Sequence, residues 1–173
     1  LANEQVKAGR CWRCNGPVVQ KEMSQWFLDI PKYAQELVDG LDDINFPENV
    51  AAMQKDWIGR SEGVEITFTV EDSNEEITVF TTRPDTIFGV TFLTLAPEHP
   101  LSKSMAKGTE FEQGWQELYE EVSIMTEFDR IKNMNKKKGS PLGKNAIHPL
   151  TGETIPIWTG NFVIASYGTG AVM

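Results

Sequence analysis

Apolar and polar residues alternate with a period of two between Val64 and Thr81, and one polar stretch, Glu71-Asp72-Ser73-Asn74, interrupts the alternation. Such alternation is typical of a strand with one buried face. A turn of acidic and amide residues between two such runs is typical of a hairpin. The pattern therefore predicts an antiparallel β-hairpin that delivers the segment after Val79 at the exit of its second strand. Its apolar positions are Val64, Ile66, Phe68, Val70, Ile77 and Val79.

The segment at that exit is Thr81-Thr82-Arg83-Pro84-Asp85-Thr86, which gathers hydroxyl groups, a guanidinium and a carboxylate around one proline. Threonine hydroxyls donate and accept hydrogen bonds without adding charge, so they suit an uncharged ligand group such as a ribose or an ester. A strand that ends in an ordinary Pro-Asp turn is the alternative, because threonine is common in strands and Pro-Asp in turns. Arg83 either contacts a phosphate or pairs with Asp85, and Asp85 could equally cap its own backbone.

Few side chains in or near this segment could act as a general base. Neither of the 2 histidines, His99 and His148, belongs to it, and the sequence has no Gly-x-Ser-x-Gly turn or plausible Cys-His pair. Asp85 is the carboxylate of the segment. We therefore expect a site that positions a water molecule and a polar group, without a classical activated nucleophile.

The remainder of the chain predicts short strands with a few helices. Helical spacing occurs in residues 31–41, 47–57 and 111–125, while a continuous apolar run predicts a central strand in 88–96. Further short strands are expected at 155–158 and 162–165. We expect a β-rich α+β fold in two parts: a small knuckle and helical connector over residues 1–60, and a larger domain over residues 61–173.

Charge and composition narrow the function. A formal net charge of −9 over 173 residues argues against a protein that grips a long nucleic-acid backbone. The basic residues between 130 and 144 form either a backbone-contacting patch or, as we prefer, a solvated loop; they are Arg130, Lys132, Lys136, Lys137, Lys138 and Lys144. A single Cys-x-x-Cys fits a reducing cytoplasm, and no apolar run approaches membrane-spanning length.

Three stretches together resemble one known family. Thr81–Thr86, continued by Ile87-Phe88-Gly89-Val90, resembles the threonine-rich peptide of the leucyl-tRNA synthetase editing domain. The start of that domain is resembled by Trp57-Ile58-Gly59-Arg60-Ser61-Glu62-Gly63, and its second pocket-forming segment by Tyr167-Gly168-Thr169-Gly170-Ala171-Val172-Met173. The resemblance covers nearly the whole chain. Valyl and isoleucyl enzymes share Thr-Thr-Arg-Pro more loosely, and Ala96-Pro97-Glu98-His99 favours the leucyl family.

The resemblance implies an editing-domain β-barrel with peripheral helices, which hydrolyses the ester of a wrongly charged tRNA(Leu) in the cytoplasm. On this reading Thr81 and Thr82 act around the ester, the water and the ribose. The substrate-binding residues would be Arg83, Asp85 and Thr86, with Tyr167 and Met173 in the pocket wall. Partners would be the 3′ end of misacylated tRNA(Leu) and the remaining domains of the synthetase, with no membrane. Editing would need no cofactor; ATP and magnesium would serve the synthetic domain, outside this chain.

One departure from the family leaves an alternative open. In the family, the second segment continues to a His-Asp and an Arg-Asp pair, whose final aspartate anchors the substrate's amino group. The sequence here stops at Met173, so we expect the isolated chain to be weak or inactive. The chain is then either a working editing domain, of leucyl or of valyl/isoleucyl type, or a folded fragment that only docks the tRNA 3′ end or the rest of the synthetase.

Cys11-Trp12-Arg13-Cys14 has the spacing of a metal-binding knuckle, with Gly16 easing the turn. A structural zinc site needs four ligands, and the chain offers no second Cys-x-x-Cys. The resemblance implies an earlier cysteine pair in the family. Cys11 and Cys14 are therefore either half of a zinc site or two unmetallated thiols.

Two thiolates alone do not hold zinc tightly, because high affinity depends on the complete ligand set. We expect the purified monomer to lose zinc on dialysis against a mild chelator, as measured by metal analysis of the dialysed protein. Stoichiometric zinc after dialysis would instead reveal further ligands or a site shared between two chains.

Overall fold

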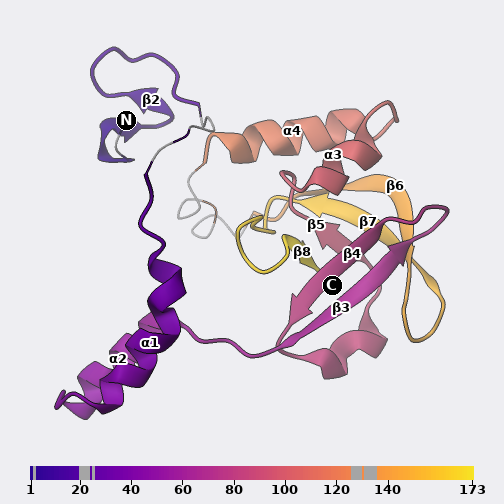
Figure 1. Ribbon diagram of the computed structural model, residues 1–173. Coiled ribbons are helices and arrows are strands. Elements are labelled where there is room, and N and C mark those ends of the chain that lie inside the picture. The colour runs from indigo at the N-terminus through magenta and orange to yellow at the C-terminus, as the bar shows by residue number, and fades with distance from the viewer. Residues whose placement is uncertain (2, 20–23, 25, 126–129, 131–135) are drawn as a thin grey trace. The chain divides into compact units, whose positions relative to one another are not determined.

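The computed structural model describes residues 1, 3–19, 24, 26–125, 130 and 136–173 (Figure 1). The chain divides into two compact units, Glu22–Glu62 as the smaller and Leu1–Lys21 with Gly63–Met173 as the larger. The predicted division into residues 1–60 and 61–173 stays a prediction. Within the described ranges, no helix has the length and apolar character needed to cross a membrane.

The smaller unit is a helical pair. A 3-10 helix, η2 (Ile30–Tyr33), leads into α1 (Ala34–Asp39) and the short η3 (Gly40–Asp42), and α2 (Glu48–Ile58) follows. Pro31 lies in the first turn of η2, where its missing N–H costs nothing. Gly59 ends α2 with φ 67°, and its N–H caps the carbonyl of Lys55. An apolar groove of about 720 Å³ lies on this pair, lined by Leu37, Leu41, Ile44, Phe46, Met53, Trp57 and Ile58 among others.

The larger unit begins with a short ribbon and continues as a sheet. The 3-10 helix η1 (Asn3–Gln5) precedes β1 (Val6–Lys7), which pairs antiparallel with β2 (Arg10–Cys11). The predicted hairpin is confirmed as β3 (Val64–Val70) and β4 (Glu76–Thr81), with Val64 opposite Thr81 and Phe68 opposite Ile77. The remaining strands are β5 (Leu93–Leu95), β6 (Gly139–Ile147), β7 (Thr154–Gly160) and β8 (Ala171–Val172).

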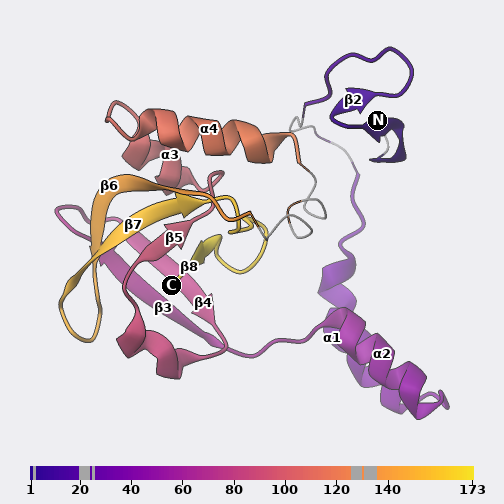
Figure 2. The ribbon, with the colours of Figure 1, turned by 180° about the vertical axis from the view of Figure 1, so that it is seen from behind.

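These strands form a six-stranded sheet in the order β4-β3-β6-β7-β5-β8. β5 runs parallel to β7, while the other neighbouring pairs are antiparallel. β8 and β4 occupy the two ends of this order, yet they pack beside one another, as both views show (Figures 1 and 2). The fold is therefore mixed α/β and rich in strands, and the sheet curls so that its two edges meet.

Two helices cover the sheet beside β6. α3 (Pro100–Ala106) and α4 (Glu112–Ser123) pack on one another and against β6 (Figure 1). The indole N–H of Trp115 donates to the carbonyl of Pro97 at 2.9 Å, so the buried ring leaves no unpaired donor. The core beneath them comprises Phe68, Val70, Ile77, Val79, Leu93, Leu95, Met105, Ala106, Trp115, Leu142, Ala146, Ile155, Ile157 and Ala171.

Two of the predicted strands are wrong in extent or type. Of residues 88–96 only Leu93–Leu95 are a strand, because the chain first forms a 3-10 helix, η4 (Pro84–Gly89). Pro84 favours a helical start, and Phe88 is 73% exposed despite its apolar neighbours. Residues 162–165 form turns instead of a strand, whereas the strand predicted at 155–158 is confirmed as part of β7, which continues to Gly160.

Gly63 lies where β3 begins, opposite the end of β4. A β-carbon there would lie 2.4 Å from the Thr81 carbonyl oxygen and 2.6 Å from Cζ of Phe80. The Gly63→Ala change should therefore destabilise the larger unit by about 1–3 kcal/mol, the usual cost of overpacking. Chemical denaturation measures this. Gly89→Ala is the matched control, since no atom lies within 4 Å of its β-carbon position; equal stability of both variants would contradict the prediction.

Candidate functional site

The threonine segment is a tight turn between β4 and η4. The hydroxyl oxygen of Thr81 accepts the backbone N–H of Arg83 at 3.0 Å. The carbonyl of Arg83 in turn accepts the Thr86 backbone N–H at 3.2 Å and the Thr86 hydroxyl at 2.8 Å. Thr81 thus keeps its hydroxyl proton for another acceptor, while Thr86 keeps its oxygen lone pairs for another donor. These two hydroxyls therefore offer one donor and one acceptor, beside the exposed hydroxyl of Thr82.

The hydroxyls of this turn lie at the surface of the larger unit. Thr81 is half-buried, because it is still part of β4, and Thr82 and Thr86 are exposed. Ile87, next to Thr86, is only 7% exposed and anchors η4 to the unit. Because Thr86 is exposed and Ile87 beside it is buried, Thr86 lies at the boundary between apolar side chains and solvent.

Arg83 and Asp85 form a two-point ion pair within this turn. Nε of Arg83 donates to Oδ1 of Asp85 at 3.1 Å, and Nη2 donates to Oδ2 at 2.9 Å. The hydrogen bonds from Arg83 hold the pKa of the Asp85 carboxyl below its ordinary value. The sequence left open whether Arg83 contacts a phosphate or pairs with Asp85, and in the structure it pairs with Asp85.

The second segment, 167–173, reaches the same end of β4. Gly168 has φ +59°, and a β-carbon there would lie 3.5 Å from Cβ of Phe80, the residue before Thr81. Gly170, with φ +70°, accepts the N–H of Ala96 at 2.9 Å and so leads β8 onto β5. Tyr167 is 71% exposed. Met173 packs against the core. The fold therefore brings the two segments together at Phe80, and the roles assigned to Tyr167 and Met173 stay predictions.

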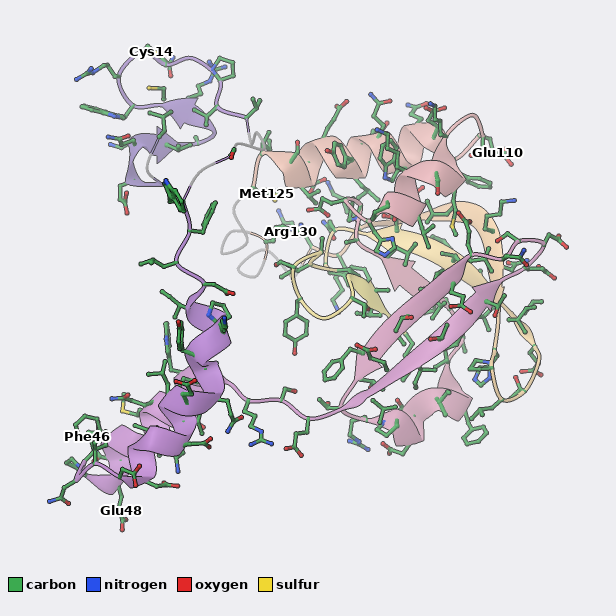
Figure 3. The ribbon with its side chains drawn as sticks, in the orientation of Figure 1. Cys14, Phe46, Glu48, Glu110, Met125 and Arg130 are labelled. Carbon is green, nitrogen blue, oxygen red and sulfur yellow. The ribbon has the colours of Figure 1, made fainter. Side chains whose placement is uncertain are left out.

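The basic region is not a uniform solvated loop. Arg130 is buried: it pairs with Glu98 and donates to the carbonyls of Val163 at 2.5 Å and Asn161 at 3.3 Å (Figure 3). Lys138 pairs with Glu121 at 2.6 Å, and Lys144 lies in β6. The predicted Lys132 falls outside the described residues. Arg130 is therefore a structural cation that ties the segment after β7 to Glu98.

The knuckle holds its two thiols in one turn. The Cys11 N–H donates to Gly16 and the Asn15 N–H to Cys11, both at 2.9 Å. Backbone hydrogen bonds from Cys14 and then Arg13 lower the pKa of the Cys11 thiol, which favours the thiolate that binds metals. Cys14 lies exposed on the same loop (Figure 3). Among the described residues no group of three or more His, Cys, Asp or Glu could hold a metal, and the zinc half-site at Cys11 and Cys14 stays a prediction.

One residue beside the threonine turn was missed at the level of sequence. Nε2 of His148 lies 2.9 Å from the carbonyl oxygen of Ile87, 61 residues away in the chain. No local pattern links the two positions, because the contact depends on how the turn after β6 lies against η4. His99, by contrast, caps α3 by accepting the N–H of Leu101.

The larger unit is therefore a mixed α/β domain with a curled sheet. It displays uncharged hydroxyl groups on the turn that follows β4. The family model described as "Leucyl-tRNA synthetase, editing domain" matches residues 55–173. The chain therefore belongs to the leucyl-tRNA synthetase editing-domain family.

Sequence similarity to known leucine–tRNA ligases extends over the whole chain. The chain is 47% identical to a leucine--tRNA ligase of Lawsonia intracellularis, covering 100% of itself and 21% of that protein. It is 50% identical to the leucine--tRNA ligase of Pasteurella multocida, covering 100% of itself and 20% of that relative. The chain thus spans about a fifth of the length of the curated relatives it matches.

A solved structure is similar in fold and in sequence. It is the ternary complex of Agrobacterium radiobacter K84 LeuRS with tRNA and LeuAMS, at a TM-score of 0.75 and 38% identity. The match covers 99% of this chain and 21% of that one. The likeness therefore supports the fold of the whole described chain as well as its family.

The Arg83–Asp85 pair predicts a measurable titration. Replacing Arg83 with Gln removes the cation, so the pKa of Asp85 should rise toward its ordinary value, as followed by ¹³C NMR of the carboxyl group. A lowered folded-state pKa stabilises the fold above the unfolded pKa, and this contribution is lost as pH falls through the folded pKa. Both side chains are exposed, at 73% and 63%, so the effect on stability should be small.

The matched control is Arg60→Gln, which breaks the exposed Arg60–Glu62 pair and leaves the threonine turn intact. The Asp85 titration should be the same in this variant as in the parent. An Asp85 pKa that did not move in Arg83→Gln would show that the pair is absent in solution.

Proposed function

We propose that this chain carries a proofreading site that hydrolyses the ester between a wrong amino acid and the terminal ribose of tRNA(Leu). The observation that carries the proposal is the turn at the end of β4, where Thr81 keeps a donor and Thr86 keeps an acceptor. Membership of the editing-domain family supports it. The proposed ligands are uncharged at the reacting centre, which suits hydroxyls.

Such a site answers a physical problem of amino-acid selection. A hydrophobic pocket separates side chains that differ by one methylene by only about 1–3 kcal/mol, or about 10–200-fold. Protein synthesis requires more, and a second site that hydrolyses wrong products supplies the difference. The ester is already activated, so the site needs mainly to position water and to stabilise the developing oxyanion.

The residues take the following roles in the proposal. Thr81 and Thr82 hydrogen-bond the ester, the attacking water and the ribose, with the Thr81 hydroxyl as donor. Thr86 lines the pocket for the amino-acid side chain, because it lies between the polar turn and the buried Ile87. The ion pair of Arg83 and Asp85 acts as a unit at the rim, and Tyr167 and Met173 contribute to the wall.

We extend the proposal to the fold and the whole protein. The close packing of β4 and β8 supports a sheet that closes as the editing-domain barrel. The names of its relatives support a full protein that joins leucine to tRNA. In the proposal, that reaction uses ATP and magnesium in another domain and takes place in the cytoplasm. Cys11 and Cys14 are half of a zinc site, and the favoured thiolate at Cys11 supports this.

The test is amino-acid release from charged tRNA. The full-length synthetase and this chain are each mixed with norvalyl-, isoleucyl- or leucyl-tRNA(Leu), and the released amino acid is measured over time. The first two substrates should be hydrolysed and leucyl-tRNA(Leu) spared. No release above buffer by the full-length protein would overturn the proposal. Activity of the full-length protein with only tRNA binding by this chain would make the chain a docking fragment.

Thr86 provides the sharpest test of the pocket. Thr86→Ala removes a methyl and a hydroxyl, so the pocket enlarges and hydrolysis of correct leucyl-tRNA(Leu) should rise, about tenfold or more, because one methylene is worth about 10–200-fold. Thr86→Tyr should fill the pocket and abolish hydrolysis of every aminoacyl ester. Rates come from the same release assay in the full-length protein.

Leucine attachment measured in parallel is the control, and it should survive both changes because that chemistry lies in another domain. If Thr86→Ala spared leucyl-tRNA(Leu) while Thr86→Tyr still hydrolysed isoleucyl-tRNA(Leu), Thr86 would not line the pocket.

A further inference from the structure

His148 is a buried histidine that the proposed chemistry does not use. It directly follows β6 and is only 3% exposed. Its backbone is fixed on both sides: its N–H donates to Glu153 at 2.8 Å, and its carbonyl accepts the N–H of Gly152 at 2.9 Å. The ring stands edge-on to Phe68, with centroids 6.0 Å apart and an interplanar angle of 89°. Backbone and ring are therefore both held in place.

The hydrogen bonds of the ring define its tautomer. Nδ1 accepts the backbone N–H groups of Leu150 at 3.2 Å and Thr151 at 3.1 Å. Because a backbone N–H only donates, Nδ1 carries no proton in this arrangement. The proton of the neutral ring is then on Nε2, which donates it to the carbonyl of Ile87 at 2.9 Å.

This hydrogen bond reaches the helix that carries Thr86. The Ile87 carbonyl also accepts the N–H of Val90 at 3.1 Å, which closes the last turn of η4. The bonds from Thr86 to Arg83 and the Arg83–Asp85 pair lie within the turn itself. They shape the turn but do not fix it against the sheet. The buried side chain of Ile87 and the bond from His148 do, and His148 follows a different strand.

We propose that His148 is a positioning residue for editing specificity: its Nε2–H, donated to the carbonyl of Ile87, sets where η4 presents Thr86 relative to Thr81. The inference rests on the proposed role of the threonine turn as the hydrolytic site. A misplacement of about 1 Å in a reacting geometry can cost about a hundredfold in rate. Losing one buried tie to η4 is therefore enough to alter both the rate and the size limit of the pocket.

Two substitutions of His148 distinguish the hydrogen bond at Nε2 from those at Nδ1. In His148→Gln the side-chain amide nitrogen replaces Nε2 and can still donate to Ile87, while the acceptor at Nδ1 is lost. In His148→Asn the amide oxygen replaces Nδ1 and still accepts from Leu150 and Thr151, while the bond to Ile87 is lost. The pair therefore distinguishes positioning of η4 from support of the turn after β6.

The variants are made in the full-length synthetase, and release from isoleucyl- and leucyl-tRNA(Leu) is measured with thermal stability. In His148→Asn we expect kcat for isoleucyl-tRNA(Leu) to fall about tenfold or more at unchanged KM, since geometry and not tRNA binding is altered. The isoleucyl-to-leucyl ratio should fall with it. His148→Gln should keep the ratio within about twofold of the parent, by the same geometric argument. Activities that simply follow stability, with an unchanged ratio in both variants, would overturn the proposal.

A measurement on the unmodified chain stands even if a variant fails to fold. ¹⁵N NMR of the His148 imidazole should show a protonated Nε2 and an unprotonated Nδ1, and the opposite tautomer would overturn the proposal. Failure of the proposed function and failure of the proposed role of His148 give different results. A parent protein that releases no amino acid removes the proposed function itself, whereas an active parent with unchanged ratios in both variants removes only the role of His148.

Discussion

The pairing of β5 on both of its sides is the constraint on which the site depends. Its three residues are fully buried, and they bond to β7 in parallel and to β8 in antiparallel orientation. The chain leaves β4 at one end of the strand order and must reach the other end to make these pairs. η4 spans part of that path, and β8 is carried back beside β4. Without this crossing, the threonine turn and the segment after Tyr167 would not meet.

The local parts of this arrangement could be predicted from the sequence, because their patterns are local. The period of two and the polar turn correctly predicted β3 and β4, and placed Thr81 at their exit. The resemblance to editing domains correctly predicted the family. The predicted strand at 88–96 failed in its first half, because Pro84 and the hydrogen bonds to the Arg83 carbonyl favour a helical turn over the apolar run.

Long-range contacts escaped prediction for a different reason. Arg130 belongs to a basic stretch, and only the folded chain brings it to Glu98 and the carbonyl of Val163. Lys138 is likewise paired with Glu121, 17 residues away, whereas the Arg83–Asp85 pair is local and was one of the two alternatives stated from the sequence. These three cations are therefore engaged within the protein, which carries a net charge of −9, whereas the hydroxyls of Thr82 and Thr86 at the turn are exposed.

The order of the strands in the sheet also affects the order in which parts of the protein fold. β3 and β4 are joined by a short turn, and hairpins of this kind close within about 1–10 μs. β5 and β8 are separated in the sequence by α3, α4, β6 and β7. Pairing between strands so far apart in the chain is slow. The threonine turn therefore exists early in folding without the segment that faces it. Under the proposed function, a nascent chain on the ribosome cannot hydrolyse the ester before β8 is in place.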